Sequence, residues 1–146
     1  MTTLPFPHVS VIGAGLMGAG IAQVCATAGC HVTLRDIDPL QGVKAKQAID
    51  ASTAKLVEKA KLTAAVREAA LSHIVFTDAL GAAAQADLVI EAIVEDLDAK
   101  QALWRELEEL APPGTVFATN TSSLRVADQA EVTDRPDRFL GLHFFN

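Results

Sequence analysis

The feature that most constrains this chain is a run of 26 residues, 9–34, that contains no Asp, Glu, Lys or Arg. A run of this length suggests a membrane-spanning helix or a signal peptide. However, five glycines interrupt it, and a signal peptide needs a basic start, whereas the first Lys or Arg of the chain is Arg35. We therefore expect neither a membrane span nor a signal peptide.

The spacing of apolar residues within this run changes from strand-like to helix-like and back. Residues 8–12 form a short segment in which three of the five residues are β-branched, which is typical of a buried parallel strand. Residues 16–28 have helical spacing and are followed by Gly29, a common helix end. Residues 31–34 predict a second strand. The run therefore indicates a βαβ unit.

The rest of the chain alternates in the same way and predicts a single α/β domain. A helix is expected over residues 97–110, stopped by two prolines and a glycine. Four further strands are expected, at residues 74–76, 87–90, 115–118 and 139–142. Strands that alternate with helices predict a doubly wound parallel sheet of the Rossmann type.

The connection between the second and third strands is too long for a simple crossover. Its sequence favours helix almost throughout, with a break and cap at residues 61–63, which predicts two helices forming an arm beside the sheet. Residues 39–72 carry a net charge of +3, whereas the whole chain carries −6. The acidic remainder argues against a nucleic-acid partner. The basic arm is either a solvated face or a surface that binds an anionic ligand.

Residues 13–18, GAGLMG, fit the GxGxxG pattern between the first strand and its helix. The first glycine permits a tight turn, the second lets the backbone approach a pyrophosphate, and the third allows close packing. Asp36 stands where a carboxylate accepts hydrogen bonds from the adenosine ribose and repels a 2′-phosphate, which favours NAD over NADP. Arg35 should point to the opposite face. The predicted cofactor residues are Gly13, Ala14, Gly15, Leu16, Met17, Gly18 and Asp36.

Polar residues also gather where three predicted strands end, the edge at which parallel sheets bind ligands. They are Glu91, Glu95 and Lys100 after the fourth strand, residues 120–123 after the fifth, and His143 and Asn146 after the last. A neutral histidine at this edge can accept a proton from an alcohol. The serines of residues 120–123 could instead be helix caps.

The remaining histidines and the cysteines predict no further chemistry. His8, His31 and His73 stand at strand entrances, the opposite edge, where we expect them to face solvent. Cys25 and Cys30 match no metal-binding spacing. We therefore expect reduced thiols, no bound metal and a cytoplasmic protein.

Four segments together resemble the NAD-binding domain of L-3-hydroxyacyl-CoA dehydrogenases, including short-chain 3-hydroxybutyryl-CoA members. They are residues 13–22, residues 86–92 with Glu95 and Lys100, the NTSSL of 120–124 and the GLHFFN of 141–146. The resemblance implies NAD-dependent, reversible oxidation of (S)-3-hydroxyacyl-CoA to 3-ketoacyl-CoA, a step of fatty-acid β-oxidation and short-chain acyl-CoA metabolism.

The resemblance also implies a role for each site residue. His143 is then the catalytic base, and Ser122 orients the substrate oxygen and touches the cofactor. Glu95, Lys100 and Asn146 line the nicotinamide end, and Lys100 and Ser122 border the substrate as well. Ser52 and Lys59 of the arm match positions that contact coenzyme A.

Family members continue past the residue that matches Asn146 with a Pro, a carboxylate that pairs with the catalytic histidine, and a helical domain that completes the acyl pocket and a homodimer. We therefore expect residues 1–146 to be the NAD-binding domain of a longer enzyme, inactive or weakly active alone. That enzyme could stand alone or belong to a multifunctional protein. Two alternatives remain, an NAD-binding module without turnover and a dehydrogenase of a small hydroxy acid.

Overall fold

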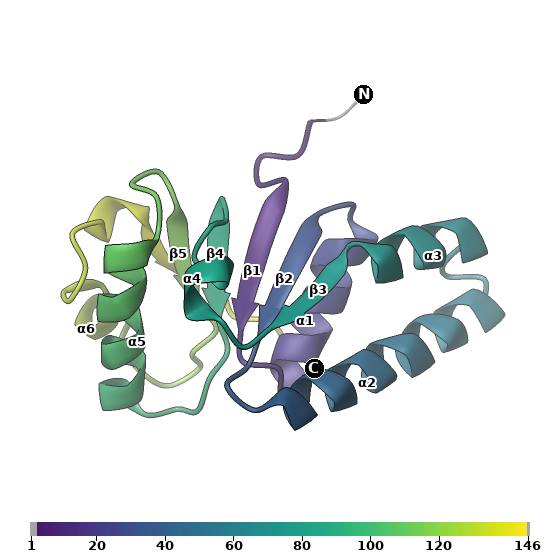
Figure 1. The fold of residues 1–146 in the computed structure, drawn as a ribbon, viewed down its shortest axis with the longest axis horizontal. Coiled ribbons are helices and arrows are strands. Elements are labelled where there is room, and N and C mark those ends of the chain that lie inside the picture. Colours follow the sequence, from purple (N-terminus) through teal and green to yellow (C-terminus); the bar gives the residue numbers. More distant parts are fainter. Residues whose placement is uncertain (1–2, 146) are drawn as a thin grey trace.

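The computed structural model describes residues 3–145, which form a six-stranded parallel sheet covered by helices on both faces (Figure 1). The strands are β1 (His8–Ile12), β2 (His31–Arg35), β3 (Ile74–Thr77), β4 (Leu88–Glu91), β5 (Val116–Thr119) and β6 (Phe139–Gly141). Their order is β3-β2-β1-β4-β5-β6, and every neighbouring pair is parallel. The predicted doubly wound sheet is confirmed, and its order reverses between β1 and β4.

The helices follow the expected alternation. They are α1 (Leu16–Thr27), α2 (Pro39–Glu58), α3 (Ala64–Ser72), α4 (Leu80–Ala83), α5 (Leu97–Leu110) and α6 (Val126–Ala130), with a 3-10 turn at Pro136–Arg138. None of the helices in residues 3–145 combines the length and the apolar character needed to cross a membrane.

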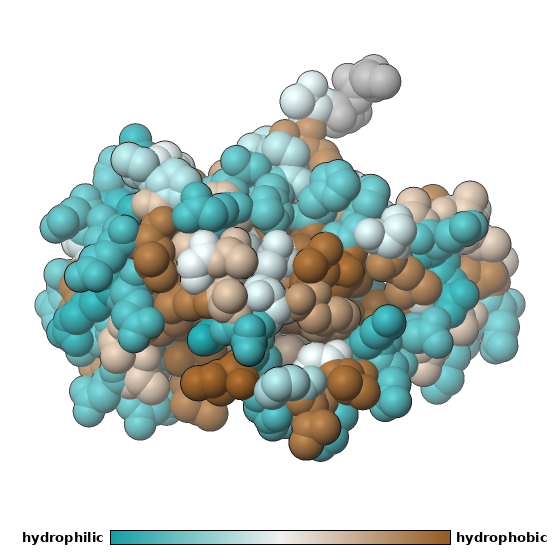
Figure 2. Space-filling view, in the orientation of Figure 1, coloured by the Kyte–Doolittle hydropathy of each residue, from teal (hydrophilic) through white to brown (hydrophobic). Residues whose placement is uncertain are grey.

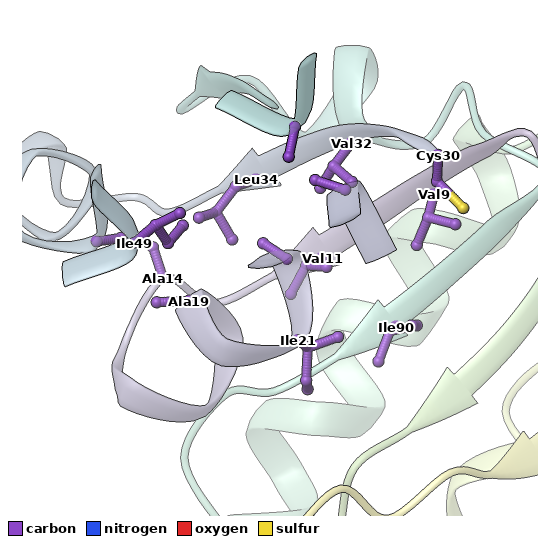
Figure 3. Close-up of a cluster of buried hydrophobic side chains, with 14 of the residues drawn as sticks. Val9, Val11, Ala14, Ala19, Ile21, Cys30, Val32, Leu34, Ile49 and Ile90 are labelled. Carbon is purple, nitrogen blue, oxygen red and sulfur yellow. The ribbon is translucent and has the colours of Figure 1, made fainter. Parts of the chain in front are cut away.

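Each face of the sheet packs its own core, because successive side chains of a strand point to opposite faces. On one face, Val9 and Val11 of β1 pack with apolar residues of α1 and α2, among them Ile21 and Ile49 (Figure 3). On the other face, α5 contributes Trp104. Its ring lies 4.9 Å from that of Phe117 and 4.8 Å from that of Phe139, between ring centroids. Large buried aromatic rings therefore anchor α5 and the β5–β6 half of the sheet.

The helical arm between β2 and β3 is confirmed. Figure 1 shows α2 and α3 extending together at one end of the molecule. The break between them is capped by Thr63, whose hydroxyl accepts a hydrogen bond from the Val66 N–H at 3.1 Å. Arg67 of α3 joins the two helices, since it donates to the buried Thr53 hydroxyl at 3.1 Å and forms an ion pair with Asp50.

Hydrophilic and hydrophobic residues occupy different parts of the surface seen in Figure 2. Figure 2 shows hydrophilic residues over the outer side of α5 and hydrophobic residues gathered over the middle of the molecule, near β3. Val75 of β3, the edge strand, is 60% exposed.

Four of the predicted strands, β2, β3, β4 and β5, end one residue later than expected, and β6 ends one residue earlier. For β4 and β5 the prediction ended at Ile90 and Ala118, but the observed strands include Glu91 and Thr119. These two residues are fully buried and stand opposite each other in the parallel pairing. The prediction of where these strands end was therefore wrong, because a polar residue normally marks a strand end and here it is a paired interior residue.

Candidate cofactor and catalytic site

The glycine turn leaves space at one position and none at the other two. A Cβ at Gly18 would lie 1.6 Å from the Gly13 carbonyl oxygen, and one at Gly13 would lie 2.5 Å from the Ala92 oxygen. Gly13 also has a φ of +104°, which L side chains rarely adopt. A Cβ at Gly15 would meet no other part of the described chain within 4 Å. Gly15 therefore opens onto free space at the N-terminus of α1, a helix end of the kind that can bind an anion through its N–H groups.

Asp36 lies immediately beside this turn. One carboxylate oxygen accepts the Ala14 N–H at 2.9 Å and the other accepts the Asp38 N–H at 2.9 Å. The side chain borders a cavity of about 420 Å³. Three carboxylates and one ammonium border this cavity, from Asp36, Asp38, Asp78 and Lys46. The excess negative charge opposes a 2′-phosphate and fits the unphosphorylated ribose of NAD.

Arg35 turns away from that cavity, as expected. Its Nε donates to the Asp78 carbonyl oxygen at 3.0 Å, and the side chain is not among the cavity's lining residues.

A buried charged network occupies the ends of β4 and β5. The Lys100 ammonium lies 2.9 Å from each carboxylate oxygen of Glu91 and 2.7 Å from Glu95 Oε1. Glu91 is 0% exposed and Lys100 is 1% exposed. The Thr119 hydroxyl donates to Glu91 at 2.6 Å, and the Ile93 N–H donates to it at 2.7 Å. Buried charges persist only when they are paired in this way.

Glu95 carries this network to the surface, since its side chain is 41% exposed. Its second oxygen accepts the hydroxyls of Thr121 at 2.7 Å and Ser123 at 2.8 Å. Partial burial raises the pKa of Glu95, but the hydrogen bonds from Lys100, Thr121 and Ser123 and the charge of Lys100 outweigh it, and the pKa falls from 4.5 to about 2.

His143 lies in a cavity of about 300 Å³ together with Ser122, Glu95 and Lys100. Its ring packs on Phe145, with centroids 4.5 Å apart. The cavity lining comprises Met17, Ala92, Ile93, Glu95, Lys100, Asn120, Ser122, His143, Phe144 and Phe145. The structure thus brings five predicted site residues to one place, Met17, Glu95, Lys100, Ser122 and His143. Asn146, another predicted site residue, lies outside the described residues.

A groove of about 580 Å³ runs between α1 and α2 and adjoins this cavity, with which it shares Met17, Phe144 and Phe145. Gly15 and Ser52 line the groove. Lys59, the second arm residue singled out, is exposed at the C-terminal end of α2 and does not line it. Of the two arm positions, the structure places only Ser52 on the path that leads to His143.

The sequence points to residues 120–123 at this edge but not to Thr119, and it does not show what each of these residues contacts. Asn120 Oδ1 accepts the Phe144 N–H at 2.7 Å, which ties the segment carrying His143 to the end of β5. Thr119 and Thr121 orient Glu91 and Glu95. The rule that ligands gather at strand ends covers all three positions, but only the fold shows that the two threonines bind carboxylates and that Asn120 binds a backbone N–H.

The opposite edge holds the other histidines, and one expectation about them is wrong. His31 is exposed, but His8 and His73 are half-buried. His8 Nε2 lies 2.9 Å from the Thr33 hydroxyl, and the rings of His31 and His73 pack with centroids 4.3 Å apart. His8 and His73 therefore pack locally, and only His31 faces solvent as expected.

Cys25 and Cys30 are free thiols. Burial, and secondarily the nearby Cys30, raises the pKa of Cys25 to about 11, so it is a poor nucleophile at neutral pH. Over residues 3–145, no three His, Cys, Asp or Glu side chains converge as a metal site would require.

Comparison with known proteins agrees with this geometry. Residues 8–146 match the family described as 3-hydroxyacyl-CoA dehydrogenase, NAD binding domain. The chain belongs to this family. The mitochondrial hydroxyacyl-coenzyme A dehydrogenase of Sus scrofa is 46% identical over 145 residues, which cover 95% of this chain and 46% of the relative. A probable 3-hydroxybutyryl-CoA dehydrogenase of Bacillus subtilis is 39% identical over 139 residues, which cover 95% of this chain and 48% of the relative.

The solved structure of 3-hydroxybutyryl-CoA dehydrogenase from Escherichia coli superposes on this NAD-binding domain with a TM-score of 0.94. It is 43% identical, and the match covers 98% of this chain and 30% of that one. The chain spans about half the length of the curated relatives named above. The family and the Rossmann-type fold implied by the sequence are therefore confirmed.

Proposed function

We propose that residues 1–146 form the NAD-binding domain of an enzyme that reversibly oxidises (S)-3-hydroxyacyl-CoA to 3-ketoacyl-CoA. The observation that carries the proposal is the shared cavity of His143, Ser122 and Glu95, which adjoins the groove that begins at the glycine turn. A base, a hydroxyl group and a nucleotide cradle thus border one continuous space. An NAD-binding module without turnover would not need the first two.

The residues present fit the cofactor. The open space over Gly15 would receive the diphosphate, and Asp36 would hold the adenosine ribose. Glu95 and Lys100, with Asn146, would border the nicotinamide end. NAD supplies the acceptor for the hydride that leaves carbon 3 of the substrate.

The chain's own residues would then manage the proton and the substrate. His143 would accept the proton of the 3-hydroxyl group, and Ser122 would donate a hydrogen bond to the same oxygen to orient it. General-base help of this kind contributes about 10²–10⁴-fold to a rate. The described residues give His143 no carboxylate hydrogen-bond partner, and the carboxylate of Glu95 is already engaged by Lys100, Thr121 and Ser123.

The acyl-CoA would follow the groove between α1 and α2, where Ser52 lies, with the basic arm near its phosphates. This chemistry distinguishes the proposal from a dehydrogenase of small hydroxy acids, which has no use for such an arm. Lys59→Glu should raise the KM for acetoacetyl-CoA and leave the Kd for NADH unchanged, because it alters substrate binding alone. An unchanged KM would assign Lys59 to a solvated face.

We further propose that a helical domain beyond this one supplies the carboxylate partner of His143, the rest of the acyl pocket and a homodimer contact. The longer relatives support this, since the chain covers only 46% and 48% of those two. The cytoplasm is the proposed location, because free cysteines suit a reducing compartment.

Cofactor binding is tested with NADH and the variant Gly15→Ala. The added methyl meets no other group in the described chain, so the fold should survive, but it occupies the space proposed for the diphosphate. We expect NADH to bind at least about tenfold more weakly, a change of about 1.4 kcal/mol. Gly81→Ala, whose Cβ is equally free and which lines none of the cavities described above, is the matched control. Unchanged NADH binding by Gly15→Ala would contradict the proposed cradle.

Turnover is tested at 340 nm with acetoacetyl-CoA and NADH, on this chain and on the chain extended with the family's helical domain. The extended chain should turn over, and His143→Gln should lower its kcat by about 10²–10⁴-fold without changing the Kd for NADH. Comparable kcat values for the short and extended chains would refute the need for a second domain.

A further inference from the structure

Glu91 is a buried carboxylate that the proposed chemistry does not use. It ends β4 in the middle of the sheet and is 0% exposed. Its two oxygens accept four hydrogen bonds, two from Lys100 and one each from Thr119 and the Ile93 N–H. A carboxylate has about four acceptor positions, so Glu91 has none left for a ligand.

Lys100 is committed in the same way. Its ammonium has three N–H donors, and three carboxylate oxygens lie within hydrogen-bond distance, two of Glu91 and one of Glu95. Its side chain is 1% exposed. Although Lys100 borders the cavity of His143, its donors already have acceptors. In this arrangement the accessible charged group of the network is Glu95, which is 41% exposed.

We propose that Glu91 is a positioning residue, which acts through Lys100 to fix Glu95 where the nicotinamide half of NAD binds. The inference rests on the proposed function. Glu91 holds the ammonium on its buried side, and the remaining N–H then fixes one oxygen of Glu95, while Thr121 and Ser123 fix the other. Glu95 is thereby held in one rotamer before any ligand arrives, which reduces the entropy lost on binding.

Replacing Glu91 by Gln would disturb this arrangement specifically. An amide has one acceptor oxygen, and its NH2 group would face the Lys100 ammonium in either orientation, and the Ile93 N–H as well in one of them. The ammonium would lose an acceptor on its buried side, and its hold on Glu95 would change. The glycine turn, which joins β1 to α1, and Asp36, which follows β2, make no hydrogen bond to this carboxylate in the described chain.

The experiment compares two ligands by calorimetry, NADH and ADP-ribose, which lacks the nicotinamide. Glu91→Gln should raise the Kd for NADH about tenfold, as expected for a charged hydrogen bond, and leave the Kd for ADP-ribose within about twofold. A merely structural role would weaken both ligands together or neither. Glu108→Gln is the matched control, because it breaks the ion pair with Arg135 near the other end of α5 and should change neither Kd.

A double-mutant cycle tests the route through Glu95. If Glu91 acts by fixing Glu95, its substitution should no longer change the Kd for NADH once Glu95→Gln is present. An undiminished effect in that background would overturn the proposal. Should Glu91→Gln fail to fold, Glu91→Leu with Lys100→Met replaces the buried pair by apolar groups, which is often tolerated. This variant should also bind NADH more weakly while its Kd for ADP-ribose stays unchanged, and normal NADH binding by it would overturn the proposal.

Binding of the two ligands by the wild-type chain distinguishes a wrong nicotinamide site from a wrong positioning role for Glu91. If it binds NADH no more tightly than ADP-ribose, the proposed nicotinamide site is wrong and this inference is wrong with it. If it prefers NADH and Glu91→Gln keeps the full preference, only the positioning role is wrong.

Discussion

The two ends of the proposed cofactor site use different chemical groups, backbone at one end and charged side chains at the other. The glycine turn, residues 13–18, uses backbone groups and the absence of side chains. The strand-end network uses charged side chains, Glu91, Lys100 and Glu95, supported by hydroxyls of Thr119 in β5 and of Thr121 just after it. An added atom disrupts the backbone turn because it collides with neighbouring groups, whereas a removed charge disrupts the network because its partners lose their ion pair. The two ends should therefore respond to opposite kinds of substitution.

The largest effect should come from adding one methyl group to the glycine turn. In Gly18→Ala the new Cβ would lie 1.6 Å from the Gly13 carbonyl oxygen, so the turn or α1 must move. We expect a loss of about 4 kcal/mol or more in the free energy of unfolding, measured by urea denaturation. Gly20→Ala, on the same helix, should be neutral or stabilising by about 0.5–1 kcal/mol. Equal stabilities for the two variants would contradict the packing seen here.

A smaller effect should come from removing a charge beside that turn. Asp36→Ala should weaken NADH about 10–100-fold, because charged hydrogen bonds are lost, and should bring NADH and NADPH to similar affinities. Fluorescence titration with both cofactors measures this. Asp78→Ala removes a carboxylate from the same cavity and leaves the hydrogen bond to Ala14 intact, so it should change the ratio of the two Kd values, NADPH to NADH, much less. If Asp78→Ala changes this ratio as much as Asp36→Ala does, the preference for NADH comes from the overall negative charge of the cavity and not from Asp36.

The smallest effect should be the pH dependence of the strand-end network. The pKa of Glu95 is lower in the folded protein, about 2, than its usual 4.5. The unfolded state therefore binds the proton more readily, and the stabilisation is present above pH 4.5 and disappears as the pH falls toward 2. Because Glu95 is 41% exposed, we expect about 1 kcal/mol or less.

Urea denaturation of the wild type and Glu95→Gln between these pH values measures that difference. The wild type should have the higher free energy of unfolding by a constant amount near neutral pH, and this difference should shrink in acid. Glu106→Gln removes an exposed carboxylate from α5, the helix that follows Glu95, and serves as the control. An advantage that grows as the pH falls would have the wrong sign and would rule out the assignment.

The sequence predicts the glycine end better than the network, and the reason is separation along the chain. Gly13, Gly18 and Asp36 lie within one βαβ unit, so their spacing alone indicates their contacts. Glu91 and Thr119 are 28 residues apart and meet because β4 and β5 pair in register. Their polarity made the predicted strands stop one residue early. Sequence spacing cannot show that a polar residue is buried against a partner from another strand.

The double role of Asp36 bears on how this domain could change its cofactor. Its carboxylate accepts the Ala14 N–H inside the glycine turn, in addition to bordering the cavity proposed for the adenosine ribose. A substitution that admits a 2′-phosphate also leaves a backbone N–H of the turn without its acceptor. Evolution or engineering toward NADP would thus require at least two coupled changes, one to remove the charge and one to restore an acceptor for Ala14. The hydrogen bond makes single-step drift in cofactor preference costly.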